Sequence, residues 1–382
     1  MGSRKRRLYV LLAAGIVAAL LPSTAAASGP TVTPVASGLD SPRGITFVHG
    51  KILVAEAGHG GSDCFFGGPG AGNICFGNSG RISWINNGAR TTLVDHLLSI
   101  TARGGFDSEG PSGLSSSEGR ILAQISTPPQ EAPPPPTITA ADFALAQQQA
   151  GRLISVHTNG TWSTVAEVGK FDFNYTLGFP EPPGPGTQEH DANPTGVLAT
   201  DEGAYVADSG SNTLDRIDED GKIKIVIYDG FRFSTPNFPS DSVPTCVVKT
   251  EDGLLVGELS GRLLKVQGTT FTVINNPLLT HITGCTSDGN GNVYFVNMFG
   301  SGAPFTPPPA SNFFIGNVVQ YNTDTGKASM LVNGLMLPNM DTIGPDGNLY
   351  VTVGSICPTA GFICNGATGG VVKITLPHGE ND

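Results

Sequence analysis

A hairpin pattern repeats six times along the chain and restricts the folds that it can adopt. In each repeat a short apolar strand begins, a tight polar turn follows, and a second strand ends 11 or 12 positions after the first began. Each turn carries a glycine, which reaches the positive φ that a tight hairpin connection requires. The first strands begin near Gly44, Gly113, Gly196, Cys246, Cys285 and Asp341, and the second strands end at Glu56, Gln124, Asp208, Glu258, Asn297 and Thr352. Self-similarity of this kind indicates a single repeat architecture.

A third strand follows each hairpin, and a fourth follows in the first five repeats. The sixth repeat lacks its fourth strand. The segment 31–36 at the other end of the chain is the simplest source of it, because pairing the two ends would leave no open sheet edge. Units that bury their apolar faces only against their neighbours suit a ring better than a β-sandwich array. We therefore predict an all-β fold, a six-bladed β-propeller with ring closure by the N-terminal strand.

The N-terminal segment has the features of an export signal. Four basic residues at 4–7 precede an apolar run over 8–21, and three alanines end the segment at Ala27. The run is shorter than the roughly 20 residues that a membrane-spanning helix requires. We predict cleavage after Ala27, a single propeller domain over 28–382, and a secreted or extracytoplasmic protein, in the periplasm or cell envelope, without a membrane span.

The composition excludes several classes of partner. The formal net charge is −11, and loss of the four basic residues of the signal would leave 17 basic residues against 32 acidic ones. A chain with this charge is unsuited to nucleic acid or to an anionic membrane surface. The 52 glycines and 29 prolines, with only 14% charged residues, are typical of tight turns around a β core. We expect a monomer.

Six cysteines in an exported chain predict disulfide bonds. Two pairs each flank a glycine-rich loop, and the remaining two occupy the same repeat position in successive units, where the innermost strands converge. The predicted pairs are Cys64 with Cys75, Cys357 with Cys364, and Cys246 with Cys285. A zinc site is disfavoured because no Cys-x-x-Cys occurs and the seven histidines do not pair at ligand spacing.

Several segments carry a family resemblance. The stretch 193–208, Asn-Pro-Thr-Gly-Val-Leu-Ala-Thr-Asp-Glu-Gly-Ala-Tyr-Val-Ala-Asp, is similar to an NHL-type propeller blade. Together with the segments 38–44, 53–61, 191–194, 241–245 and 255–259, it resembles the ScyD/ScyE family of exported propellers, named for the gene clusters that make the pigment scytonemin. The resemblance covers nearly the whole mature chain and implies a role accessory to secondary metabolism or to envelope processes. It supplies no catalytic residues.

The long connections are all predicted to open on one face of the propeller. In this fold the connections from second to third strand and from blade to blade share a face, and only these connections are long here. We call this side the insertion face; it comprises 58–80, 96–111, 127–150, 170–192, 229–241, 300–315 and 355–369. Rigid scaffolds carry binding residues on such loops, although neutral insertion is the alternative. We predict that the insertion face binds an unidentified protein, glycan or small-molecule ligand.

Aromatic residues gather in two of these connections. They would form either a binding wall or caps over the apolar ends of the blades. They are Phe171, Phe173, Tyr175, Phe179, Phe231, Phe233 and Phe238.

Polar residues recur at the strand ends nearest the predicted channel mouth. One set lies at the second-strand ends, and the other precedes the first strands and includes Glu109, Asp191, Asn193, Asp241, His281 and Asn339. The candidate site residues are Glu56, Asp208, Glu258, Asn297, Asp191 and Asn193. Their oxygens could hold Ca²⁺ or another divalent cation, which would act as a Lewis acid in a gluconolactonase-type hydrolase. Alternatively, these side chains accept hydrogen bonds from turn amides.

Three functions remain open from the sequence, of which a lyase or quinoprotein-type enzyme is the least favoured because the histidines and basic residues that it would need are not convergent. The first is a ScyD/ScyE-like binding or scaffold module that acts through the insertion face. The alternative is a metal-dependent hydrolase or lactonase with an acidic site at the channel mouth. No Gly-x-Ser-x-Gly elbow, Ser/His/Asp set or phosphate loop is present to indicate another chemistry.

Overall fold

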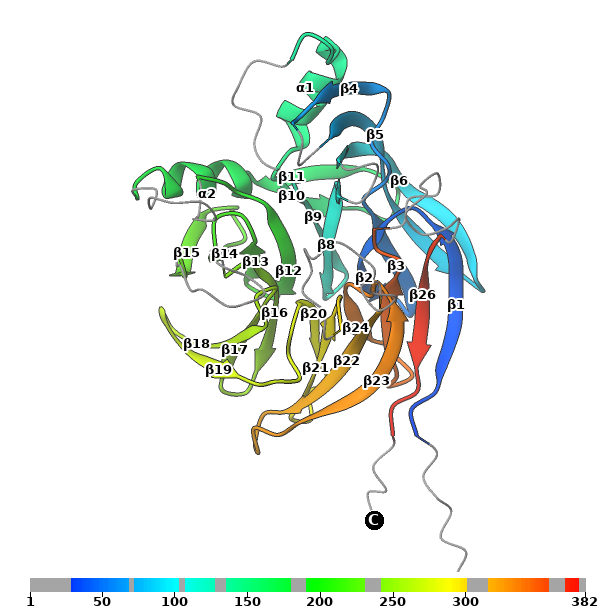
Figure 1. The fold of residues 1–382 in the computed structure, drawn as a ribbon, viewed down its shortest axis with the longest axis vertical. Helices are drawn as coiled ribbons and strands as arrows, with labels where there is room; N and C mark the ends of the chain where they lie inside the picture. Colours follow the sequence, from blue (N-terminus) through cyan, green and yellow to red (C-terminus); the bar gives the residue numbers. More distant parts are fainter. Residues whose placement is uncertain are drawn as a thin grey trace, which may run out of the picture. The chain divides into compact units, whose positions relative to one another are not determined.

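Six antiparallel sheets surround a common axis in the unit Pro30–Leu376 (Figure 1). The computed structural model describes residues 29–68, 72–102, 107–127, 135–179, 190–230, 242–300, 315–356 and 368–377. All six predicted hairpins are present as pairs of adjacent strands at the inner side of each sheet. The predicted all-β, six-bladed β-propeller is confirmed.

The blades are numbered here along the chain, with their strands given from the axis outward. Blade 1 consists of β2 (Pro42–Val48), β3 (Lys51–Glu56), β5 (Asn73–Asn86) and β6 (Ala89–Ala102), extended by β4 (Asp63–Phe66) and β7 (Asp107–Glu109). Blade 2 consists of β8 (Pro111–Ser117), β9 (Arg120–Ile125), β10 (Leu153–Val156) and β11 (Trp162–Ala166). Blade 3 consists of β12 (Pro194–Thr200), β13 (Gly203–Asp208), β14 (Thr213–Ile217) and β15 (Ile223–Tyr228).

The remaining blades follow the same order. Blade 4 consists of β16 (Pro244–Thr250), β17 (Gly253–Glu258), β18 (Arg262–Gln267) and β19 (Thr270–Asn275). Blade 5 consists of β20 (Ile282–Ser287), β21 (Asn292–Asn297), β22 (Ile315–Asn322) and β23 (Ala328–Met336). Blade 6 consists of β24 (Asp341–Ile343), β25 (Leu349–Val353), β26 (Gly369–Ile374) and β1 (Val32–Leu39).

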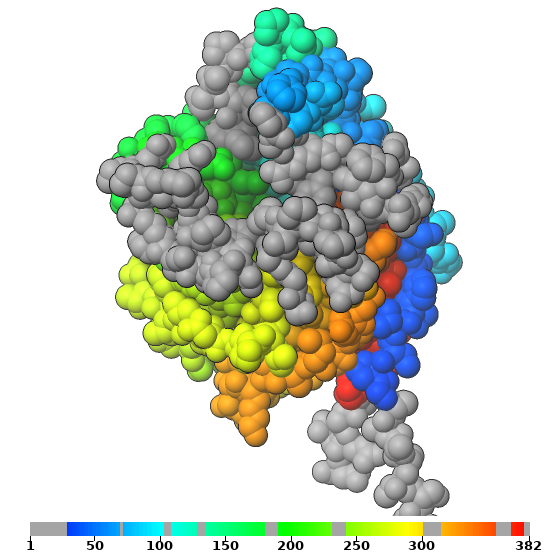
Figure 2. Space-filling model, in the orientation of Figure 1, coloured from blue at the N-terminus to red at the C-terminus, as the bar shows by residue number. Residues whose placement is uncertain are grey.

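The two ends of the chain close the ring, as predicted. Strand β1 pairs antiparallel with β26, with Val32 opposite Ile374 and Leu39 opposite Gly369. In the space-filling view the blue atoms of β1 lie directly beside the red atoms of β26 (Figure 2). The N-terminal strand therefore covers what would otherwise be an unpaired edge of blade 6.

Backbone contact between neighbouring blades fixes the inner rim of the ring. A Cβ atom added at Gly44 of β2 would lie 2.3 Å from the carbonyl oxygen of Ser112 in β8. The equivalent atom at Gly113 would lie 2.5 Å from the carbonyl oxygen of Thr195 in β12. Glycine is required at these positions because the next blade occupies the space of a side chain.

Blade 4 carries a cysteine at this inner position, and the cysteine bonds to the next blade. Cys246 forms a disulfide with Cys285 of blade 5, at a Cα separation of 5.8 Å. The second predicted bond is also present and joins Cys64 of β4 to Cys75 of β5. Both pairings are confirmed. Cys357 and Cys364 lie outside the described residues, so their pairing stays a prediction.

The hydrophobic core lies between the blades. Leu214 and Ile227 of blade 3, for example, pack in one cluster with Val256 and Leu264 of blade 4, and all four side chains are buried. Full burial of an aliphatic side chain of this size contributes about 1.5 to 3 kcal/mol. Each blade is therefore held mainly by its two neighbours.

Two helices lie in the long connections between strands. Helix α1 (Ala140–Gln149) begins after Thr139, whose hydroxyl accepts the backbone N–H of Asp142 at 3.2 Å, which satisfies one free donor of the first turn. Helix α2 (Val168–Thr176) was not expected, because this segment was assigned to an aromatic loop. Neither helix has the length and apolar character needed to cross a membrane, and no other described segment forms one that does.

Candidate functional site

The six side chains at the second-strand ends are all fully buried. Their exposed fraction is 0% in every case, so none of them offers a free surface to the channel. They are Glu56, Gln124, Asp208, Glu258, Asn297 and Thr352.

Most of these side chains accept hydrogen bonds from the backbone that enters their own blade. Asp208 Oδ1 accepts the backbone N–H of Asn193 at 2.7 Å, together with the N–H groups of Gly210 and Ser211. Glu56 Oε2 accepts the N–H of Asp40 at 2.7 Å. A buried carboxylate bound in this way avoids the desolvation cost of an unpaired group and holds the connection to its strand.

The same pattern continues in blades 5 and 6 with neutral side chains. Asn297 Oδ1 accepts the N–H of Thr280 at 3.2 Å, and Thr352 Oγ1 accepts the N–H of Met340 at 3.1 Å. Glu258 differs, because it is held by Arg262 at 3.2 Å and by the hydroxyl of Ser260. Burial raises the pKa of Glu258 well above its usual value, although the charge of Arg262 opposes this.

A cavity of about 270 Å³ lies at the mouth of the central channel, on the insertion face. All six blades contribute to it, through residues at the start of the first strands and residues just beyond the second strands. We call it the channel-mouth cavity. Its lining includes Asn193 from the predicted candidates, and also Glu109 and Asn339.

The lining of this cavity is divided into a polar and an apolar side. Blades 1 to 3 contribute Arg43, Ser108, Glu109, Ser112, Ser126, Asn193, Thr195 and Ser209. Blades 4 to 6 contribute Val243, Leu259, Met298, Phe299, Met340 and Ile356, together with the polar residues Thr245, Thr283 and Asn339. One small molecule bound here would meet hydrogen-bonding groups on one side and apolar groups on the other.

Several lining residues directly follow a predicted candidate. Ser209 follows Asp208, Leu259 follows Glu258, and Met298 follows Asn297. Successive side chains of an extended strand point in opposite directions, so the residue after the buried one faces the channel. This alternation was available from the sequence and could have located these lining residues.

Of the remaining predicted positions, Asp191 and His281 do not line this cavity. Asp191 is half-buried, and its carboxylate accepts the backbone N–H of Ala192 at 2.7 Å. His281 is buried, which lowers the pKa of its imidazole, and its ring packs on Phe299. Asp241 lies outside the described residues. Within the described ranges, no group of three or more His, Cys, Asp or Glu side chains has an arrangement that could hold a metal ion.

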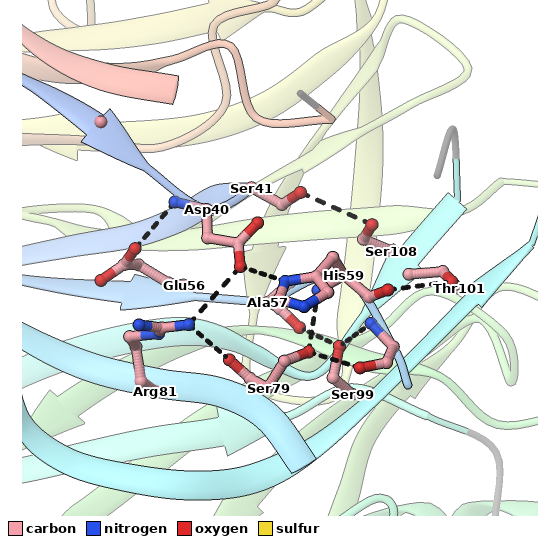
Figure 3. Close-up of polar contacts among 12 residues, drawn as sticks. Asp40, Ser41, Glu56, Ala57, His59, Ser79, Arg81, Ser99, Thr101 and Ser108 are labelled. Carbon is pink, nitrogen blue, oxygen red and sulfur yellow. Dashed lines mark hydrogen bonds and ion pairs between the residues drawn. The ribbon is translucent and has the colours of Figure 1, made fainter. Parts of the chain in front are cut away.

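A buried aspartate holds a half-exposed histidine close to the cavity (Figure 3). Asp40 is 1% exposed, and its Oδ2 lies 2.5 Å from Nδ1 of His59, whose side chain is 43% exposed. Arg81 approaches the same oxygen at 3.5 Å. Next to Asp40, the hydroxyl of Ser41 donates to that of Ser108, a cavity residue, at 3.5 Å.

The backbone around His59 is fixed from several directions (Figure 3). Its N–H donates to the hydroxyl of Ser79 at 2.9 Å, and the N–H of Gly60 donates to the hydroxyl of Ser99 at 2.9 Å. Gly60 has a φ of +72°, and a Cβ there would lie 2.6 Å from the carbonyl oxygen of Cys75. The imidazole is therefore held in one place, with Nδ1 occupied by Asp40 and Nε2 as the nitrogen that a ligand could meet.

Neither a protein-family model nor a curated protein matches the sequence. Solved structures match over most of the chain. One is a protein of unknown function from Bacteroides thetaiotaomicron, with a TM-score of 0.53, 11% identity, and coverage of 91% of this chain and 76% of that chain. Another is a protein assigned as a gluconolactonase, with a TM-score of 0.51, 12% identity, and coverage of 91% and 92%.

A third match is regucalcin, a calcium-binding protein from Agrobacterium tumefaciens, with a TM-score of 0.48, 13% identity, and coverage of 90% of each chain. At these identities the similarity shows the fold alone. It places the chain among six-bladed β-propellers.

Proposed function

We propose that the protein is an exported binding propeller whose channel-mouth cavity holds one small amphipathic ligand. The observation that carries this proposal is the division of the cavity lining into a polar side on blades 1 to 3 and an apolar side on blades 4 to 6. Two disulfides suit an oxidising compartment outside the cytoplasm. The resemblance to the ScyD/ScyE family supports a scaffold or accessory role for such a module.

The lining indicates the chemistry of the ligand. Met298, Phe299 and Leu259 offer a flexible apolar surface to an aromatic or aliphatic body. Across the cavity, the side chains of Asn193 and Thr195 offer hydrogen-bonding groups to a polar end. A wholly charged or wholly apolar ligand would leave one side of the cavity without matching groups.

Binding of the amphipathic dye anilinonaphthalene sulfonate tests this proposal. We expect saturable binding with one dye per chain, and at least a tenfold loss of affinity in Leu259→Trp, because the indole fills the cavity. Val273→Trp is the matched control, since Val273 is 42% exposed on the outer strand β19. Equal dye affinity in wild type and Leu259→Trp would contradict the proposal.

A second proposal is that the site hydrolyses an ester or lactone. It is supported by the pair of Asp40 and His59, which combines a buried carboxylate with an accessible imidazole beside the cavity. In this reaction Nε2 of His59 takes a proton from water, the resulting hydroxide attacks the carbonyl carbon, and the C–O bond breaks. The alkoxide that leaves then takes the proton back from Nε2. Among the described residues no group could hold the expected divalent cation, so the proposed step rests on His59 and Asp40.

The second proposal is tested with dihydrocoumarin as the lactone, with and without Ca²⁺. We expect wild type to hydrolyse it and His59→Ala to lose at least a hundredfold in kcat/KM. Asp40→Asn should also lower kcat/KM, since an amide stabilises the imidazolium formed in the reaction less than a carboxylate does. Hydrolysis no faster than the uncatalysed reaction, both with and without Ca²⁺, would contradict the hydrolase proposal and leave only the binding role.

A further inference from the structure

Three aspartates from three different elements meet inside blade 3. Asp172 lies on α2, Asp208 ends β13, and Asp215 lies on β14, and each side chain is 0% exposed. Both oxygens of Asp172, Oδ2 of Asp208 and Oδ1 of Asp215 have no hydrogen-bond donor among the described residues. These four oxygen atoms therefore have one another as the available hydrogen-bond partners.

Few other charged or titratable groups face this cluster. In the described part of the chain, no lysine or arginine forms an ion pair with any of the three aspartates. Arg216, the next residue on β14, pairs instead with the exposed Glu202. Tyr175 of α2 is a further titratable group beside the cluster; burial raises its pKa, and the charges of Asp215 and Asp172 raise it further.

Three ionised carboxylates cannot share a buried site without a counter-charge, so the cluster must retain protons. Burial raises the pKa of Asp172 well above its usual value, and the charges of Asp215 and Asp208 raise it further. Burial also raises the pKa of Asp215, to about 8. With protons present, one carboxyl can donate to the next, which supplies the donors that the four oxygens lack.

The same cluster holds α2 to the blade. Val168, Asp172 and Thr176 are buried and lie four residues apart, so they form one face of the helix. Asp172 is the only charged residue on that face. If it ionised, the helix would carry an unpaired charge into the interior of blade 3 and would be driven off.

Asp208 also connects the cluster to the channel-mouth cavity. Its Oδ1 holds the N–H of Asn193 at 2.7 Å, while its Oδ2 belongs to the cluster. Ser209 then donates its N–H to the carbonyl oxygen of Asn193 at 3.0 Å, and its hydroxyl lies 2.7 Å from that of Thr195. Asn193, Thr195 and Ser209 together form the blade 3 wall of the cavity.

We propose that Asp172, Asp208 and Asp215 form a proton-dependent latch that keeps α2 docked and the blade 3 wall of the cavity ordered, so that ligand binding weakens as the cluster loses its protons. The part about ligand binding rests on the proposed binding function. The part about α2 does not.

Hydrogen exchange measured without ligand tests the latch. The peptides covering 168–179 and 190–200 should lose protection in wild type from pH 7 to 9, by about tenfold per pH unit for each proton released, after correction for intrinsic exchange. Asp172→Asn keeps the shape and a donor but cannot ionise, so its protection should stay constant. Buffers contain a chelator, so that no cation replaces the protons. Asp220→Asn, at an exposed turn of the same blade, is the control and should behave as wild type.

The outcomes are distinct. The same loss of protection in wild type and Asp172→Asn would overturn the latch, as would constant protection in both. Asp215→Asn provides a second test if Asp172→Asn does not fold. Dye affinity measured over the same pH range extends the test to the cavity. We expect the affinity to fall with rising pH in wild type but not in Asp172→Asn. Dye binding that fails at every pH would overturn the binding function while leaving the exchange result to decide the latch.

Discussion

The hydroxyl of Thr352 donates to the carbonyl oxygen of Arg43 at 2.8 Å, across a sequence separation of 309 residues. Thr352 lies one residue before the end of β25 in blade 6, and Arg43 lies on β2, the innermost strand of blade 1. The ring is therefore closed at its inner rim by this contact, as well as at its outer side by the pairing of β1 with β26. Blade 1 and blade 6 are thus joined at the inner rim, and the two ends of the chain are joined at the outer side, so loss of either contact should weaken the closed ring.

Deletion of residues 31–36 should abolish the folded monomer. The outer edge of blade 6 would lose its partner strand and expose unpaired backbone groups, which favours aggregation. Size-exclusion chromatography and thermal unfolding measure the effect, with deletion of 378–382 as the control at the other end of the chain. An unchanged melting temperature after loss of 31–36 would show that the pairing of β1 is dispensable.

Replacement of both Cys246 and Cys285 by serine should lower the free energy of unfolding by about 4 kcal/mol, from the loop closed over 39 residues. The bond joins two blades, so the loss should appear in global unfolding by urea. Replacement of Cys64 and Cys75 is the comparison, since that bond spans 11 residues within one sheet and should have a smaller effect. Equal losses in the two double variants would argue against this ranking.

Asp208→Ala should lower the free energy of unfolding by about 1 to 3 kcal/mol, because the three amides that bind Oδ1 lose their acceptor. The loss should be the same with and without a chelator. Asp208→Asn should retain more stability than Asp208→Ala, since its carbonyl can still accept. A stabilising effect of Ca²⁺ that is present in wild type and absent in Asp208→Ala would indicate a cation ligand instead.

Asp346 should contribute to the loss of stability in acid. Burial opposes ionisation of its carboxyl, but Lys373 at 2.6 Å, Asn348 and Tyr350 together hold the pKa of Asp346 below its usual 3.8. A carboxyl with a lowered pKa in the folded state stabilises the fold above the unfolded-state value, and this contribution is lost as the pH falls below about 3.8. Asp346→Asn should therefore show a shallower decline between pH 5 and 2 in urea unfolding. A decline identical to wild type would assign the acid sensitivity to other groups.

The repeat positions of the hairpins could be predicted because they depend on local properties. A glycine turn and an alternating apolar strand are visible within a window of 12 residues, and the missing fourth strand left one segment to close the ring. Helix α2 could not be predicted in this way. Its sequence contains Gly169, Asn174 and Thr176, which are weak helix formers, and the helix is held by tertiary burial of Val168 and Asp172.

The predicted candidates at the second-strand ends directly precede residues that line the channel-mouth cavity, but they do not line it themselves. The cavity is lined by Ser209 and Leu259, whereas the neighbouring Asp208 and Glu258 are fully buried. The pair of Asp40 and His59 lies 19 positions apart on segments that only the folded blade brings together. Contacts of this kind depend on the geometry of the connections, which no local pattern specifies.

The division of the channel-mouth cavity has a consequence for ligand orientation. A propeller has near-sixfold pseudosymmetry, and a uniformly lined mouth would accept a ligand in several equivalent rotations about the channel axis. Here the polar and apolar sides make these rotations inequivalent. An amphipathic ligand should therefore bind in a single rotational orientation, with its polar end towards blades 1 to 3.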